Sequence, residues 1–166
     1  MSWSLKNTSV IMTPFLEDMA TAIADGLSFD IVITSAKRSA RAQAIAMKNK
    51  IARGENLRTI YADDQYADDV TEAYPDLNAM TVVTQRYADA GGGSKHTSGQ
   101  GLDLRTWDPA HVEPMIARAE SLGYKAVLES DHLHIGVGTS GDSGDAKKSY
   151  MMIGLLLVGG LWMLKK

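Results

Sequence analysis

The stretch His96-Thr-Ser-Gly-Gln-Gly-Leu-Asp103 places a histidine and an aspartate seven residues apart, with two glycines between them. Its end, Leu102-Asp103-Leu104, alternates apolar and polar side chains. This alternation predicts a strand with both leucines in the core and Asp103 on the opposite face. A second cluster, Asp131-His-Leu-His134, follows later in the chain, so three of the four histidines lie in these two segments.

The two clusters together offer imidazole and carboxylate groups for one metal ion. The chain has no cysteine, so a zinc site would have to use histidine and carboxylate ligands. A catalytic zinc keeps three protein ligands and one open position for water, and His96, Asp103 and His134 would supply those ligands. Histidines in strands are also often structural residues, so the spacing alone leaves a metal-free reading open.

The neighbours of these ligands suggest further chemistry. Asp131 stands three residues before His134 and could take a proton from a metal-activated water if the segment turns there; Glu129 is the alternative. His132 could donate a hydrogen bond to a developing oxyanion. His132 and His134 are two residues apart on a predicted strand, and we expect their side chains to leave opposite faces, so that one metal need not bind both.

The rest of the chain predicts an α+β domain over residues 1–137, a small antiparallel sheet with helices packed against it. The charged helix 40–54, which carries Gln43 and Lys50, is expected to present these side chains to solvent. We expect a surface loop with a short helix over residues 55–80 and a brief strand over 81–84. The other predicted elements are a helix from Thr13-Pro14 to Gly26 with Phe15, Met19, Ile23 and Leu27 on its buried stripe, a helix over 110–122, and strands over 30–35, 102–104 and 124–128.

Charge is distributed unevenly along the sequence. Residues 1–146 carry 13 basic and 20 acidic side chains, a formal net charge of −7. Nucleic-acid binding draws on lysine and arginine, so we expect no nucleic-acid partner. The same negative charge predicts no electrostatic steering toward an anionic substrate.

The C-terminal segment has a different composition from the rest. Residues 138–148 are rich in glycine, serine and aspartate and predict a linker, and no charged residue occurs from 149 to 164. Two lysine pairs, Lys147-Lys148 and Lys165-Lys166, flank the apolar run, with Tyr150 and Trp162 near its ends. Such flanks are typical of a membrane span, so residues 149–166 predict a single C-terminal transmembrane helix; a core or interfacial helix is the alternative.

The pattern His96-x-x-Gly99-x-x-x-Asp103, followed by Asp131-His-Leu-His134, resembles the zinc peptidases that cut peptidoglycan peptides. These are the D-Ala-D-Ala carboxypeptidases and dipeptidases, the L-Ala-D-Glu endopeptidases of phage lysins and the penicillin-insensitive murein endopeptidases. The hedgehog signalling domain is similar in fold. The resemblance covers roughly residues 13–137 and implies zinc ligation by His96, Asp103 and His134.

The resemblance also implies roles for residues that do not bind the metal. Asp131 matches the catalytic base of the carboxypeptidase and lysin branches, and His132 matches a histidine that lines the site in the murein endopeptidase branch. Arg38 matches an arginine that the family supplies to the site. It follows Ala36-Lys37 where the family usually has Gly-Tyr, and Arg41 is a possible substitute.

The expected function is therefore a membrane-anchored zinc metallopeptidase that hydrolyses peptidoglycan stem or cross-link peptides and contacts the lipid bilayer through its tail. The membrane would be that of a membrane-containing bacteriophage, whose virion would carry the protein as a lysin, or the bacterial inner membrane. A catalytically silent zinc-binding module for assembly or binding is the alternative. A membrane-associated structural protein without a metal is a third reading.

Overall fold

The computed structural model describes residues 1–129 and 131–138, which form five α-helices, a short 3₁₀ helix and one five-stranded sheet. In chain order the elements are β1 (Trp3–Leu5), α1 (Pro14–Ala24), β2 (Ile31–Ser35), α2 (Ala40–Ala52), η1 (Leu57–Thr59), α3 (Asp64–Glu72), α4 (Leu77–Asp89), β3 (Gly101–Arg105), α5 (Pro109–Ser121), β4 (Tyr124–Leu128) and β5 (His132–Val137).

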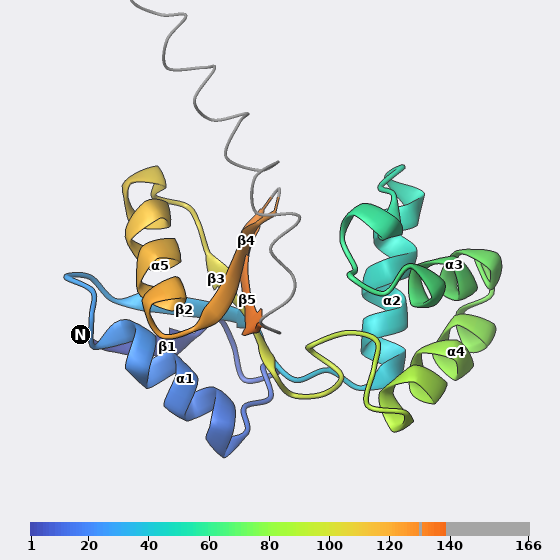
Figure 1. The fold of residues 1–166 in the computed structure, drawn as a ribbon, viewed down its shortest axis with the longest axis horizontal. Coiled ribbons are helices and arrows are strands. Elements are labelled where there is room, and N and C mark those ends of the chain that lie inside the picture. Colours follow the sequence, from blue (N-terminus) through green and yellow to red (C-terminus); the bar gives the residue numbers. More distant parts are fainter. Residues whose placement is uncertain (130, 139–166) are drawn as a thin grey trace, which may run out of the picture.

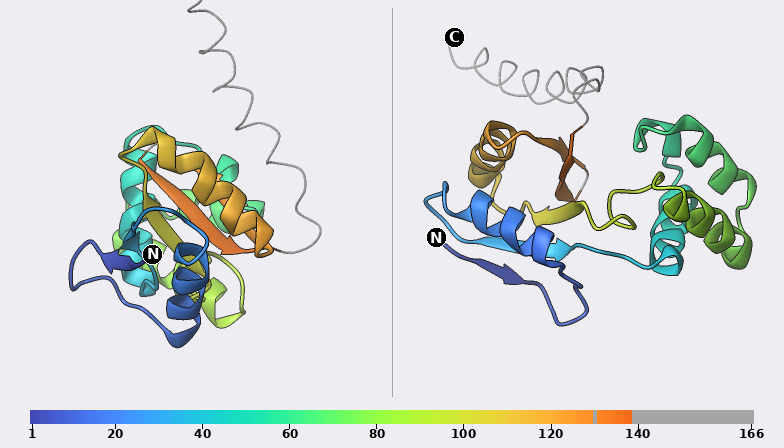
Figure 2. Two further views of the ribbon diagram at one scale, coloured as in Figure 1. Left: turned by 90° about the vertical axis from the view of Figure 1, so that its left-hand side faces the viewer. Right: turned by 60° about the horizontal axis from the view of Figure 1, so that its bottom comes forward.

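These elements form two lobes, which lie side by side in Figure 1. The sheet lobe contains β1 to β5 with α1 and α5, and the helical lobe contains α2, η1, α3 and α4, residues 40–89. Each lobe has its own cluster of buried apolar side chains. Two segments, residues 36–39 and 90–100, connect the lobes and can be followed in the right-hand view of Figure 2. The helical lobe is thus inserted between β2 and β3.

The sheet has the strand order β1-β2-β3-β5-β4 and is mixed. β1 runs parallel to β2 because α1 carries the chain back between them, whereas the other neighbouring strands are antiparallel. The α+β class is confirmed, but the prediction of a purely antiparallel sheet is wrong at this edge. Strand β1 has only three residues, too few for the alternation that reveals a strand in sequence.

One face of the sheet is apolar and is covered by α1 and α5. Helix α1 begins as predicted: the Thr13 hydroxyl accepts a hydrogen bond from Leu16 N at 3.3 Å, and Pro14 is its first residue. Its buried stripe contains Leu16 in place of Phe15, which is exposed. The core includes alternate residues of three strands, namely Ile31, Ile33, Leu102, Leu104, Leu133 and Ile135.

The helical lobe contains a full helix, α4, where a brief strand was predicted over residues 81–84. The Asp76 carboxylate caps α4 by accepting hydrogen bonds from Asn78 N and Ala79 N at 2.8 and 3.2 Å. Met80 and Thr84, one turn apart, are both buried. The Thr84 hydroxyl donates to the Met80 carbonyl at 2.8 Å. Capping and burial at helical spacing therefore outweigh the strand preference of β-branched residues.

The protein is expected to become easier to unfold above about pH 10, because the helical lobe buries phenols. Burial raises the pKa of Tyr66 to about 12, and burial also raises the pKa of Tyr61. Between about pH 10 and 12 the folded state keeps protons that the unfolded chain has lost, so stability falls by about 1.4 kcal/mol per pH unit for each such tyrosine. Denaturant titrations at several alkaline pH values measure this slope. Tyr66→Phe should reduce the slope by the contribution of one tyrosine, and an unchanged slope in that variant would contradict the prediction.

The predicted C-terminal elements lie outside the described residues, apart from Gly138 at the start of the linker. This applies to the rest of the linker, 139–148, and to the transmembrane helix over 149–166. Within residues 1–129 and 131–138, no helix combines the length and the apolar character that a membrane span requires.

Candidate metal centre

A cleft of about 570 Å³ lies between the second face of the sheet and α2. This face is polar, because the residues that alternate with the core positions of β2, β3 and β5 include Thr34, Asp103, His132 and His134. The opposite wall comes from the helical lobe, from residues of α2 such as Lys50 and from the segment 59–62 that follows it. The cleft therefore brings together segments that are far apart in the chain.

His96 enters the site from the segment that connects α4 to β3. Gly99, whose φ of +69° favours glycine, lets this segment turn back so that His96 and Asp103 face each other. The His96 ring is 5% exposed, and its Nδ1 donates a hydrogen bond to the Ala36 carbonyl at 2.6 Å. Because a carbonyl only accepts, this bond fixes the tautomer and leaves the Nε2 lone pair directed at Asp103.

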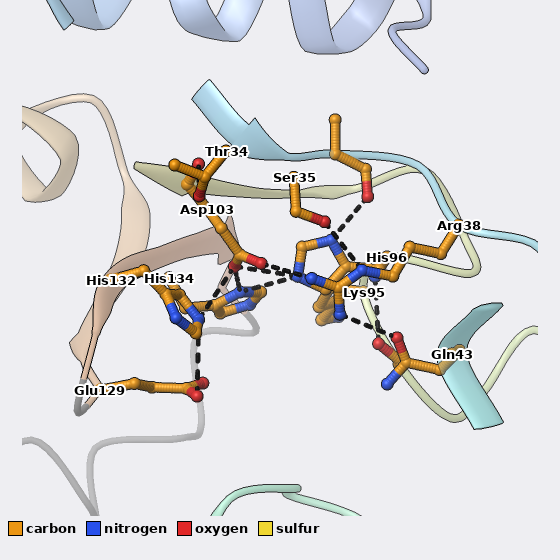
Figure 3. Close-up of polar contacts among 12 residues, drawn as sticks. Thr34, Ser35, Arg38, Gln43, Lys95, His96, Asp103, Glu129, His132 and His134 are labelled. Carbon is orange, nitrogen blue, oxygen red and sulfur yellow. Dashed lines mark hydrogen bonds and ion pairs between the residues drawn. The ribbon is translucent and has the colours of Figure 1, made fainter. Parts of the chain in front are cut away.

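Asp103 and His134 complete a group of three candidate ligands (Figure 3). Asp103 Oδ1 lies 3.0 Å from His96 Nε2 and 2.9 Å from His134 Nδ1, and the two nitrogens are 3.2 Å apart. A tetrahedral zinc with bonds of about 2.0–2.2 Å holds its ligand atoms roughly 3.3 Å apart. The spacing and the nitrogen–nitrogen–oxygen donor set therefore fit a zinc-sized ion, and a metal could bind at the three residues predicted to hold it.

The electrostatics of the group favour the protonation states that bind metals. Burial lowers the pKa of His96, which keeps the imidazole neutral. Burial alone would raise the pKa of Asp103, but the hydrogen bond from His134 holds it well below its usual value of 3.8. A neutral imidazole and an ionised carboxylate are the forms in which these side chains ligate a metal.

Arg38 reaches the site, as the resemblance implies, but it contacts a ligand. Its Nη2 donates to Asp103 Oδ2 at 2.7 Å, its Nε to Ser35 Oγ at 2.7 Å and its Nη1 to Gln43 Oε1 at 3.2 Å. Arg38 thus orients the Asp103 carboxylate and leaves Oδ1 for a metal. Arg41 instead bonds to the Asn78 side chain, on the surface of the helical lobe.

His132 and His134 share the polar face of β5, so the expectation of opposite faces is wrong. Residues two apart on a strand point the same way, and the residue between them, Leu133, is in the core. His132 Nε2 lies 3.4 Å from Asp103 Oδ1 and 3.5 Å from Glu129 Oε2. His132 is therefore next to the three ligands without belonging to the group.

The two candidates for the base lie on different sides of His132. Asp131 is 81% exposed and accepts a hydrogen bond from His132 Nδ1 at 2.6 Å, and this bond lowers its pKa. Glu129 is 19% exposed and approaches the other ring nitrogen, which also faces Asp103. The two nitrogens of an imidazole point apart, so Glu129 is on the side of the metal ligands and Asp131 is on the far side.

The helical lobe contributes residues that were expected on a solvent-exposed face. Lys50 Nζ contacts Glu129 Oε2 at 2.5 Å, and its side chain is 14% exposed. Gln43 is fully buried and joins Arg38 to the hydroxyl of Tyr61, which accepts from Gln43 Nε2 at 2.8 Å. No local pattern in helix 40–54 separates these side chains from its exposed ones, since their partners are far away in sequence.

Comparisons with protein-family models, with curated proteins and with solved structures found no match for this chain.

Proposed function

We propose that the protein is a zinc-dependent hydrolase of peptide bonds in peptidoglycan stem or cross-link peptides. The observation that carries the proposal is the convergence of His96, Asp103 and His134 in a cleft, with their ligand atoms all within 4.8 Å of one another. The cleft gives a substrate access to this group, as a catalytic metal site requires. The choice of peptidoglycan peptides rests on the resemblance of the two motifs to peptidases of that class.

A zinc ion at these ligands would supply a Lewis acid for the scissile carbonyl and lower the pKa of water toward ~7. Glu129 is our choice for the group that takes the proton from water and returns it to the leaving amine. Glu129 faces the ring nitrogen of His132 that also faces Asp103, and it is held by Lys50, whereas Asp131 contacts the other ring nitrogen. In this assignment Asp131 accepts from His132 Nδ1 and orients the ring, and His132 in its doubly protonated form donates from Nε2 to the developing oxyanion.

The proposed setting is a membrane beside the wall that the enzyme cuts. The uncharged run between two lysine pairs supports a C-terminal anchor. A virion-associated lysin of a membrane-containing bacteriophage and a wall-remodelling enzyme of the bacterial inner membrane both meet this description. Detection of the protein in purified virions would support the first, and its absence from virions but presence in host membranes would support the second.

Digestion of purified peptidoglycan tests the proposed activity. The full-length protein should release peptide fragments when loaded with zinc, release none after treatment with a chelator, and regain activity when zinc is restored. Mass spectrometry of the fragments identifies the new ends and therefore the bond that is cut. A folded, zinc-loaded protein that releases no fragment would refute the hydrolase and leave the zinc-binding module as the function.

A further inference from the structure

Basic side chains are concentrated in the cleft between the lobes. Of the 13 basic and 18 acidic side chains in residues 1–129 and 131–138, seven basic and only three acidic ones line this cleft. The rest of the described chain keeps six basic against 15 acidic side chains. A cleft with low-dielectric walls focuses such a potential, so it attracts anions even though the protein carries net negative charge. The net negative charge of residues 1–146 predicts no attraction for an anionic substrate, but the cleft itself provides that attraction.

The basic residues on the two walls differ in their partners. On the helical lobe, Lys50 of α2 pairs with Glu129, and Arg53, just after α2, pairs with Glu55. On the sheet side, the cleft-lining cations Lys6, Lys95 and Arg105 form no ion pair with any residue in the described part of the chain. The Arg105 guanidinium is instead stacked 3.8 Å from the ring centre of Trp107, which keeps it in place without neutralising it.

Lys95 lies next to the metal ligands. Gly101 and Gly136 are paired across β3 and β5, and the side chain of Lys95 passes over them. A Cβ added at Gly101 would lie 3.0 Å from both Lys95 Cβ and His134 Cε1, and one at Gly136 would lie 3.3 Å from Lys95 Cγ. The two glycines therefore leave the space that lets a lysine side chain and the His134 ring share one end of the cleft.

We propose that the cleft selects an anionic peptide and that Lys95 binds a carboxylate of this substrate beside the metal group. The inference rests on the proposed function and adds the substrate class to the same site. Arg38 does not fill this role, because its guanidinium already bonds to Asp103, Ser35 and Gln43. Within residues 1–129 and 131–138 the Lys95 ammonium group forms no ion pair, so it is available to bind a substrate carboxylate.

Two forms of one peptide test the proposal by calorimetry on the full-length protein, both zinc-loaded and metal-free, the latter to prevent turnover. The probes are the stem tetrapeptide L-Ala-γ-D-Glu-L-Lys-D-Ala with both amines acetylated, which carries two negative charges, and the same acetylated peptide with both carboxyl groups amidated, which carries none. The acid form should bind about tenfold more tightly at low salt, and added salt should reduce the difference. Lys95→Met and Lys95→Gln should lose most of the preference. Lys37→Met, a change at an exposed lysine outside the cleft, should keep it.

The outcomes separate this proposal from the hydrolase itself. Equal affinity for the two peptides, binding of neither at about 1 mM, or a preference that survives both folded Lys95 variants would each overturn the role of Lys95. Preference for the acid form without cleavage of any peptidoglycan would refute the hydrolase and retain the anionic ligand class. Cleavage of peptidoglycan together with equal affinity for both peptides would support the hydrolase and refute the preference for an anionic ligand.

Discussion

The His96→Ala protein is expected to lose the proposed zinc binding and the proposed hydrolytic activity together. The variant removes one of three candidate ligands, and the remaining pair, Asp103 and His134, would bind zinc weakly. Even residues that only support a ligand change metal affinity by about 10–100-fold, so the loss of a ligand should weaken zinc binding by about 10³-fold or more. Hydrolysis should fall by at least a similar factor, because the proposed reaction depends on the metal.

Zinc content after dialysis against a competing chelator, together with thermal unfolding, measures this effect. Zinc at about 1,000 times its dissociation constant should stabilise the wild-type protein by about 4 kcal/mol, and His96→Ala should lose most of that gain. His111→Ala is the matched control, since His111 lies on α5, stacked on Phe29 and away from the candidate ligands. A His96→Ala protein that retains one zinc per chain would show that the zinc is bound at another site.

The Glu129→Gln protein is expected to bind zinc normally and to hydrolyse its substrate about 10²–10⁴-fold more slowly. Glutamine has the shape of glutamate and still offers Lys50 an oxygen, but it cannot accept the proton. Asp131→Asn should have a smaller effect, about tenfold, because the Asp131 carboxylate acts on the reaction only through the orientation of His132.

Steady-state kinetics on the fragment identified by peptidoglycan digestion would compare the two variants, with zinc content measured for each. The assignment predicts a loss in kcat for Glu129→Gln with little change in KM. If Asp131→Asn proves the more damaging change while zinc is retained, the base is Asp131, as the resemblance implies, and Glu129 only holds Lys50.

Sequence patterns predicted the parts of this fold that depend on neighbouring residues. The Thr13-Pro14 cap of α1, the alternation of Leu102 and Leu104 around Asp103, and the helices starting near residues 40 and 110 all have local causes. The three candidate ligands come together because strand alternation puts Asp103 and His134 on one face and the turn at Gly99 brings His96 to it. Arg38 was predicted at the site only through the resemblance.

The features that the sequence did not predict depend on long-range contacts. Strand β1 exists because its backbone pairs with β2, and α4 forms because Met80 and Thr84 are buried within the helical lobe. Lys50 belongs to the site because the insertion brings α2 to a loop 79 residues away in the chain, where Glu129 meets it. Such partners leave no periodic signal in either segment.

Because the helical lobe is inserted between β2 and β3, the two walls of the cleft belong to two lobes that each have their own core. The sheet lobe and the connecting segment 90–100 supply the candidate ligands and the residues proposed for proton transfer, while the helical lobe forms the facing wall of the cleft. Residues 40–89 are therefore the segment through which evolution or engineering could change the ligand range of the cleft, provided that Lys50 and Gln43 keep their contacts with Glu129 and Arg38. Exchange of residues 40–89 that keeps Arg38 and His96 in the connecting segments 36–39 and 90–100 is a route to new specificity.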